Sequence, residues 1–366
     1  MRFAEIPTQS FWKDLSRSLI GRGILSRFAA FLLLLPAFTA VAQFRDQKVP
    51  KLIREGKDAI ELEDFSRAAS AFEQAHEISP DIAEVSRGLL LSYLQLGRLP
   101  EAEKIGQAAV LQWPKDAELP HWLGLVYFKQ HRNALAVSQL QRAESLDPSQ
   151  YDVHYDLALV LLSDDNYSDA AIELEKAITI SPRVALSHVL LGRAYQNTNR
   201  SLQAIEQFQD ALRIDPSLTL GHYHLGFGYA SLGRNDEAIA EYEKELQHSS
   251  NNPTVLYQLG HCQIEAGDWK PAVTHLEKVT QLDPQNSDAS YDLGKALLLE
   301  GDAEGAVSAL RRAIELKPAN PSPHYQLSRA LAKLGKKDEA KSELEIFSAL
   351  KKSQPVTGGM AAGPVQ

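Results

Sequence analysis

Cysteine is nearly absent from this 366-residue chain: Cys262 is the only one, so no intramolecular disulfide can form. Packing alone must hold the fold, even if the surroundings are oxidising. Basic residues are also in deficit, with 38 Lys and Arg against 47 Asp and Glu and a formal net charge of −9. Because nucleic-acid phosphates and anionic lipids attract basic surfaces, this balance argues against nucleic-acid partners and against adhesion to anionic lipid.

Motifs of catalysis are missing as well. The sequence contains no Gly-x-Ser-x-Gly, His-Glu-x-x-His or phosphate-binding P-loop pattern. Its carboxylate pairs, such as Asp164 with Asp165 and Glu173 with Glu175, are expected in turns or on outer helix faces, where solvated charge is the ordinary state. We therefore expect no catalytic residue, no cofactor and no enzymatic activity in this chain.

Long hydrophobic runs are confined to residues 28–41, a stretch too short for an ordinary membrane span of about 20 residues. Arg17, Arg22 and Arg27 precede this stretch, and it ends at residues 40–42, Ala-Val-Ala, a small-x-small cleavage pattern before Gln43. The pattern predicts that residues 1–42 are a signal peptide and that the mature chain contains no membrane span. With a single cysteine, a periplasmic or secreted bacterial product is expected; an uncleaved N-terminal anchor is the alternative.

A 34-residue period organises the rest of the chain. Seven prolines mark it: Pro80, Pro114, Pro148, Pro182, Pro216, Pro284 and Pro318. A fixed period in this range is typical of stacked supersecondary units. Numbering each unit so that this proline is place 32 gives nine repeats, which start at Val49, Ala83, Ala117, Tyr151, Ala185, Thr219, Pro253, Ser287 and Pro321.

Each repeat predicts two short helices. Apolar residues recur at three- and four-residue spacing over places 4–12 and 20–30, the signature of amphipathic helices. Place 20 is Ala in all nine repeats and place 8 is small in eight, which lets two helices approach closely. Gly at place 15 in five repeats suits a left-handed residue that ends the first helix. The expected fold class is all-α.

This pattern resembles the tetratricopeptide repeat family. Repeat 5 follows the family pattern closely, with Leu191-Gly192, Tyr195, Ala204, Phe208, Ala211 and Pro216. The resemblance covers residues 49–352 and implies an α-solenoid over residues 43–352, a right-handed superhelix of helical hairpins. Residues 353–366 are rich in Gly, Pro and Ala and are expected to be a disordered tail.

Departures from the family pattern are local. Histidine replaces the family's aromatic residue at place 4 in four repeats, as His154, His188, His222 and His324. At place 27, Glu245 and Val279 replace alanine, so we expect the loosest packing between repeats 6 and 7. The polar first helix of repeat 1 should cap one end of the stack. At the other end, the helix over about residues 337–352 is expected to cap itself.

Histidine is plentiful enough, at eleven residues, to raise the question of a metal site. Equivalent helices of neighbouring repeats lie roughly 10 Å apart, however, whereas zinc requires its ligand nitrogens at about 2.0–2.1 Å. We therefore interpret the place-4 histidines as packing residues and expect no metal. Cys262, at place 10 of a first helix, is interpreted in the same way.

The resemblance implies that places 2, 5, 9, 12 and 13 of the first helices line a concave face. Place-5 tyrosines beside basic residues are typical of protein interfaces; alternatively, these tyrosines pack between helices and expose only their hydroxyls. A carboxylate clamp is not supported, because the clamp pattern is absent at Ile53, Lys57, Arg87 and Gly88. The predicted partner-binding residues are Arg87, His121, Tyr155, Arg193, Tyr223, Phe227, Tyr257, His261, Tyr291, Lys295, Tyr325 and Arg329.

These features together predict an exported, non-catalytic adaptor. It would bind a protein or an extended peptide on its concave face and serve the assembly of an envelope or secretion complex. One alternative is a self-associating structural scaffold, in which the ends or the convex face of the stack pair. Another is a recognition arm for a transferase on a different chain.

Overall fold

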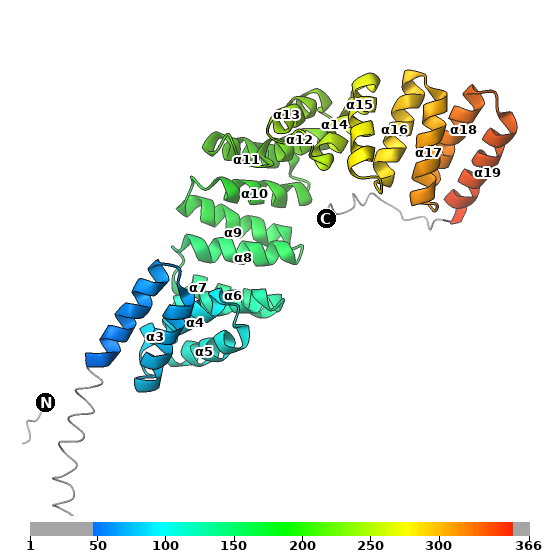
Figure 1. Ribbon diagram of the computed structural model, residues 1–366. Helices are drawn as coiled ribbons and strands as arrows, with labels where there is room; N and C mark the ends of the chain where they lie inside the picture. The colour runs from blue at the N-terminus through cyan, green and yellow to red at the C-terminus, as the bar shows by residue number, and fades with distance from the viewer. Residues whose placement is uncertain (1–46, 354–366) are drawn as a thin grey trace, which may run out of the picture. The chain divides into compact units, whose positions relative to one another are not determined.

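The computed structural model describes residues 47–353, and all regular structure within them is helical (Figure 1). The all-α solenoid expected from the sequence is confirmed. A helix over residues 47–61 comes first. It is followed by α3 (Phe65–Ile78), α4 (Ala83–Gln95), α5 (Leu99–Gln112), α6 (Glu118–Lys129), α7 (Asn133–Leu146), α8 (Tyr151–Ser163), α9 (Tyr167–Ile180), α10 (Ala185–Asn197), α11 (Ser201–Ile214), α12 (Gly221–Ser231), α13 (Asn235–His248), α14 (Pro253–Ala266), α15 (Trp269–Leu282), α16 (Ser287–Glu300), α17 (Ala303–Leu316), α18 (Pro321–Lys333) and α19 (Lys337–Ser353).

The chain divides into two compact units, which we call unit 1 (up to Ser149) and unit 2 (from Gln150). The predicted signal peptide and residues 354–366 of the predicted tail lie outside the described residues. Ser353 is the last residue of α19, so the helix extends one residue past the predicted end of the solenoid. Among the described residues, no helix is long and apolar enough to cross a bilayer.

The turn between the two helices of each repeat is the same throughout. The second helix begins at place 17 in all nine repeats, from Phe65 in the first to Lys337 in the last. Place 15 has a positive φ in every repeat, whether or not it is glycine. Five repeats have Gly there, and the other four have Glu63, His131, Asp165 and Asn199. The left-handed turn is therefore a property of the hairpin, and glycine only lowers its cost.

Small residues set the distance between the paired helices. A Cβ atom placed on Gly192 of α10 would lie 2.4 Å from the ring of Phe208 on α11, so only glycine allows this contact. The alanine at place 20 is fully buried in repeats 1–8. In repeat 9, Ala340 is partly exposed because no described helix packs beyond α19.

First helices of neighbouring repeats touch one another within each unit. The pairs in contact are α4 with α6 in unit 1, and α10 with α12, α12 with α14, α14 with α16 and α16 with α18 in unit 2. Neighbouring second helices in the described residues make no comparable contact. The first helices therefore lie on the inner side of each stack, where the resemblance implied the concave face.

Repeat 6 departs from the regular start of its first helix. α12 begins at Gly221, after Leu220 adopts a left-handed conformation with φ 61°. Glu245, at place 27 of α13, compensates: its carboxylate is 3% exposed and accepts hydrogen bonds from the backbone N–H groups of Leu220 at 3.0 Å and Tyr223 at 3.3 Å. The carboxylate thus satisfies donors at the start of α12.

The expected loose packing between repeats 6 and 7 is not confirmed. One buried apolar cluster includes Tyr242 of α13 together with Val255, Leu259 and Cys262 of α14, so the core is continuous across this junction. Val279, the other departure at place 27, is fully buried against Leu256 and Ala289. Both residues are therefore accommodated at place 27, Glu245 by backbone hydrogen bonds and Val279 by apolar contact.

The two ends of the described stack differ. The helix over residues 47–61 exposes Lys51, Arg54 and Asp58, in agreement with a polar cap. The expectation that α19 caps itself is wrong in part. This helix has no buried residue, and Leu344 and Ile346 are 45% and 39% exposed. In repeat 8 the residue equivalent to Leu344, Leu310, is fully buried, because another repeat follows it.

Candidate partner-binding face

The predicted binding residues of unit 2 gather on one side of its first helices. We call this side the inner face; it consists of places 5, 6 and 9 of α10, α12, α14, α16 and α18. Places 5 and 9 share a helix face because they are four residues apart. Side chains of α14 and α16 join across this face: His261 of α14 contacts Asp292 of α16, and Lys295 of α16 pairs with Glu265 of α14.

The place-5 tyrosines both pack and present a surface. Tyr223 lies half-buried, with its ring centroid 6.0 Å from Tyr242 and 6.5 Å from Phe227, and burial raises its pKa. Tyr155, on α8, stacks on Tyr151 at 5.6 Å. Tyr325 is 43% exposed and rests against Phe347 at 5.3 Å. The tyrosines are therefore partly structural, and of these three Tyr325 is the one most available to a partner.

A buried carboxylate organises the inner face between α14 and α16. Asp292, at place 6 of α16, is 4% exposed, and its Oδ2 accepts a hydrogen bond from His261 Nδ1 at 3.0 Å. The Tyr257 hydroxyl also lies near this carboxylate. The hydrogen bond that His261 donates to Asp292 raises the pKa of His261. At Tyr257, burial is the main cause of a raised pKa, and the charge of Asp292 comes second. Asp292 thus orients the ring of His261 and places a negative charge beside Tyr257.

Cations on the inner face differ in how they are paired. Lys295 Nζ lies 2.7 Å from Glu265 Oε1, a hydrogen bond that lowers the pKa of the Glu265 carboxyl. Arg329 is exposed and donates to the amide oxygen of Gln326 at 2.9 Å. Arg193 is exposed on α10, and neither arginine forms an ion pair with a carboxylate of the described residues. Tyr291 lies partly exposed on α16 between these groups.

The predicted binding residues of unit 1 are less accessible. Arg87 lies between two acidic side chains, with nitrogens 3.7 Å from Asp116 and 3.2 Å from Glu118. His121 is only 7% exposed, so its ring is packed and not presented at the surface. The structure therefore corrects the expectation for His121, because place 5 of α6 faces a well-filled core here.

Sequence reasoning missed Asp292, and also the partners of the place-4 histidines. Each of these rings bonds through Nδ1 to place 23 of its own repeat, at 2.6–2.8 Å. The pairs are His154 with Glu173, His188 with Gln207, His222 with Glu241 and His324 with Glu343. The sequence signal that could have revealed these pairs is the polar residue at place 23 in all four repeats. The rings thus join the two helices of a hairpin; the absence of a metal stays a prediction.

Cys262 is a packing residue, as interpreted from its position. Its side chain is 2% exposed, and burial raises the pKa of the thiol to about 11. The reactive thiolate is therefore scarce at neutral pH.

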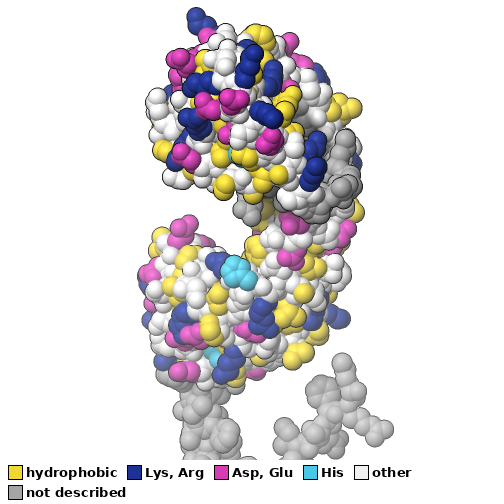
Figure 2. Space-filling view, turned by 90° about the vertical axis from the view of Figure 1, so that its right-hand side faces the viewer, with side chains coloured by type: hydrophobic (Ala, Val, Ile, Leu, Met, Phe, Trp, Pro, Cys, Tyr) yellow, Lys and Arg dark blue, Asp and Glu magenta, His cyan; other side chains and the backbone are white. Residues whose placement is uncertain are grey.

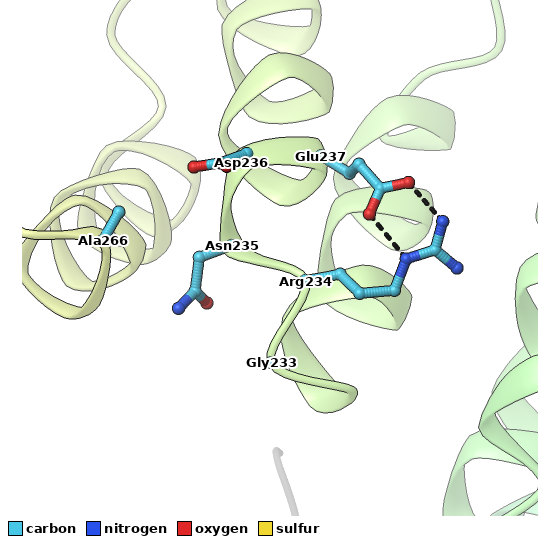
Figure 3. Close-up of a pocket in the computed structure, with 6 residues that line it drawn as sticks. All are labelled: Gly233, Arg234, Asn235, Asp236, Glu237 and Ala266. Atoms are coloured by element: carbon cyan, nitrogen blue, oxygen red, sulfur yellow. Dashed lines mark hydrogen bonds and ion pairs between the residues drawn. The ribbon is translucent and has the colours of Figure 1, made fainter.

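The surface of unit 2 is hollowed between helix ends. Figure 3 shows one hollow where α12 turns into α13 beside the end of α14, lined by Gly233, Arg234, Asn235, Asp236, Glu237 and Ala266. Arg234 and Glu237 pair with each other there. On the face shown in Figure 2, acidic and basic side chains are interspersed. Recognition is therefore expected to depend on local rows of side chains.

Comparisons with solved structures found several tetratricopeptide repeat proteins. The crystal structure of MamA is 22% identical over 44% of this chain and 95% of that chain, with a TM-score of 0.43. YrrB, described as a TPR protein with an unusual peptide-binding site, is 22% identical over 50% of this chain and 95% of that chain, with a TM-score of 0.45. MamA from Desulfovibrio magneticus RS-1 is 21% identical over 46% and 96%, with a TM-score of 0.45.

Family models match most of the repeat region. Three tetratricopeptide repeat models match residues 53–117 and 123–185, residues 185–218 and residues 229–290. A fourth model, anaphase-promoting complex, cyclosome, subunit 3, matches residues 265–346. No curated protein matches the chain. With the hairpin geometry repeated from helix to helix, these matches identify the chain as a member of the tetratricopeptide repeat family.

Proposed function

We propose that this chain is a non-catalytic adaptor that binds a protein or an extended peptide along the inner face of unit 2. One observation carries the proposal: half-exposed tyrosines and exposed arginines line consecutive first helices that are in direct contact. Tyrosine and arginine dominate the energetics of protein interfaces, because both combine apolar area with hydrogen bonding. The well-packed core below holds these side chains in place before a partner arrives, which lowers the entropy cost of binding.

The cellular setting of the proposal rests on the sequence. Residues 1–42 would direct the chain to the periplasm or to secretion, where it would help assemble an envelope or secretion complex. Any chemistry in that complex, such as that of a transferase, would belong to another chain. Cell fractionation would test the export step: the chain should occur in the periplasmic or secreted fraction, shortened by its signal peptide.

The binding role can be tested with variants that spare the core. Changing Arg193, Tyr325 and Arg329 together to Ala removes three of the most exposed inner-face side chains. Capture of partners from an envelope extract should fall sharply, while circular dichroism stays helical. The control changes Arg213 of α11 and Arg312 of α17, both on second helices, to Ala and should leave capture intact. Unchanged capture by the inner-face variant would refute the proposal.

A self-associating scaffold is the second candidate function, and exposed apolar side chains in the middle of α19 favour it. Leu344 and Ile346 are exposed there, and an exposed apolar pair can be buried by a second copy. Sizing chromatography across concentrations separates the candidates. An oligomer that dissociates when Leu344 and Ile346 are both changed to Lys would support the scaffold, and a persistent monomer would exclude it.

A further inference from the structure

Basic side chains are concentrated at one place of the inner face. Four of the five place-9 residues from α10 to α18 are basic or histidine, and Phe227 of α12 is the fifth. We call this set the place-9 row; its members are Arg193, Phe227, His261, Lys295 and Arg329. The chain as a whole has a formal net charge of −9, so such a row runs against the overall composition.

Carboxylates close to this row are already engaged within the protein. Asp292 is buried beneath His261 and Tyr257, and Glu265 pairs with Lys295. Asp288, on α16, pairs with Lys317 at 2.9 Å. The row therefore keeps unbalanced positive charge at Arg193 and Arg329, near its two ends. The row begins at α10. The preceding first helix, α8, has a leucine at place 9 and carries the acidic residues Asp152 and Asp156.

The spacing of the row constrains a ligand. First helices of neighbouring repeats lie roughly 10 Å apart, and an extended peptide advances about 3.3 Å per residue. A peptide that runs across the first helices would therefore pass one repeat about every three residues. Carboxylates at that interval could reach successive cations, and an apolar residue would fall opposite Phe227.

We propose that the inner face of α10–α18 binds an extended acidic segment of a partner protein. Glutamate or aspartate at intervals of about three residues would face Arg193, His261, Lys295 and Arg329. New ion pairs would form chiefly at the two arginines, whose charge is unbalanced, and an apolar residue would pack on Phe227. Arginine gives two-pronged hydrogen bonds to a carboxylate, and Tyr291 and Tyr325 supply apolar contact beside them. This inference rests on the proposed function and specifies the chemistry of the partner.

A designed peptide tests the inference on the full chain. The probe is a fluorescent peptide of about 13 residues with Glu at the four positions facing cations, Leu facing Phe227, and Ser or Ala elsewhere. Matched peptides carry Gln or Lys in place of every Glu. Fluorescence anisotropy should show the Glu peptide binding roughly 10-fold more tightly than the Gln peptide at low salt. This preference should shrink as salt screens the charges.

Charge-reversal variants locate the site. R193E combined with R329E should weaken the Glu peptide about 10-fold and strengthen the Lys peptide. R213E combined with R312E makes the same change in net charge on second helices and should alter neither affinity by more than about 2-fold. Equal effects of the two variants, with circular dichroism unchanged, would show nonspecific attraction and overturn the inference.

The outcomes separate this inference from the proposed function. If the Glu and Gln peptides bind equally and Tyr325→Ala weakens both, the inner face binds peptides but has no preference for acidic ones. The proposed function then stands and the acidic partner is excluded. If no peptide binds a correctly folded chain, the acidic segment is excluded, and the capture experiment with the Arg193, Tyr325 and Arg329 variant decides the proposed function independently.

Discussion

At the scale of single residues, Tyr242 carries a polar group that its surroundings do not satisfy. It occupies place 24 of repeat 6, where repeats 1 and 5 have Phe72 and Phe208. Its side chain is fully buried, and its hydroxyl has no hydrogen-bond partner among the described residues. A buried, unpaired polar group costs about 1–3 kcal/mol. The hydroxyl is therefore expected to lower the stability of unit 2.

Removing that hydroxyl should stabilise the protein. We expect Tyr242→Phe to raise the free energy of unfolding by about 1 kcal/mol, since the ring keeps its packing. Urea denaturation followed by circular dichroism measures the change. Tyr195→Phe is the matched control: its hydroxyl donates to Glu175 at 2.6 Å, so its loss should destabilise. A destabilised Tyr242→Phe protein would imply a hydrogen bond that the structure lacks.

His224 links stability to pH. Its ring stacks on Phe208 at 5.5 Å, and burial first, with Arg193 nearby second, lowers its pKa from 6.5 to about 4. The unfolded chain therefore takes up the proton before the folded chain does. Stability is fully present above about pH 6.5 and is lost as the pH falls toward about 4.

The size of this effect can be measured with a substitution. Between about pH 7.5 and about pH 5, His224 should account for roughly 2 kcal/mol of lost stability. His224→Phe keeps an aromatic ring against Phe208 and should remove that part of the pH dependence. Identical slopes for the wild type and His224→Phe would refute the assignment.

At the scale of helices, a repeated cluster joins second helices to the next repeat. We call it the tyrosine–arginine clasp: Tyr at place 11 and Arg at place 16 of one repeat, with Glu or Gln at place 25 of the preceding repeat. The guanidinium lies 3.9–4.7 Å from the ring centroid in all four examples. They are Tyr93, Arg98 and Glu73; Tyr127, Arg132 and Gln107; Tyr195, Arg200 and Glu175; and Tyr229, Arg234 and Gln209.

The clasp in repeat 5 is suited to a quantitative test. Arg200 is 3.9 Å from the Tyr195 ring centroid, the shortest such distance among the four clasps. Arg200→Ala should lower the free energy of unfolding by about 0.5–1 kcal/mol through the lost cation–π contact. A double-mutant cycle with Tyr195→Leu isolates the coupling between the two residues. Arg213→Ala, on α11, the helix that follows Arg200, should have little effect; a coupling near zero would show that the clasp does not stabilise the stack.

Periodicity predicted the helices well because each place has one physical role. The left-handed residue at place 15 and the buried alanine at place 20 follow from the repeat alone. The clasp and Asp292 were not predicted, because each depends on a pair of places in two different repeats. Glu245 was misjudged because its place was read alone: there it interrupts a packing position, whereas in the structure it accepts hydrogen bonds at the start of α12 in the same repeat.

At the scale of the whole molecule, each repeat depends on its neighbours for burial. Stability in such an array is a sum of repeat terms and interface terms, so it need not be uniform along the chain. In unit 2 one apolar cluster runs from Ala158 to Cys262, whereas α19 has no buried residue and, among the described helices, packs mainly on α18. The polar inner face lies above this well-packed region, which holds the binding residues in place.

This difference predicts a gradient of local opening toward α19. Native-state hydrogen exchange should show the amides of α19 exchanging roughly 100-fold faster than those of α11, because fraying of an end helix exposes little apolar surface. Leu344→Ala should leave the exchange of α11 unchanged, whereas Phe208→Ala, which removes a buried ring, should accelerate it. Equal protection of both helices would mean that unit 2 opens only as a whole. In that case α19 would be held by contacts beyond the described residues, such as a second copy of the chain.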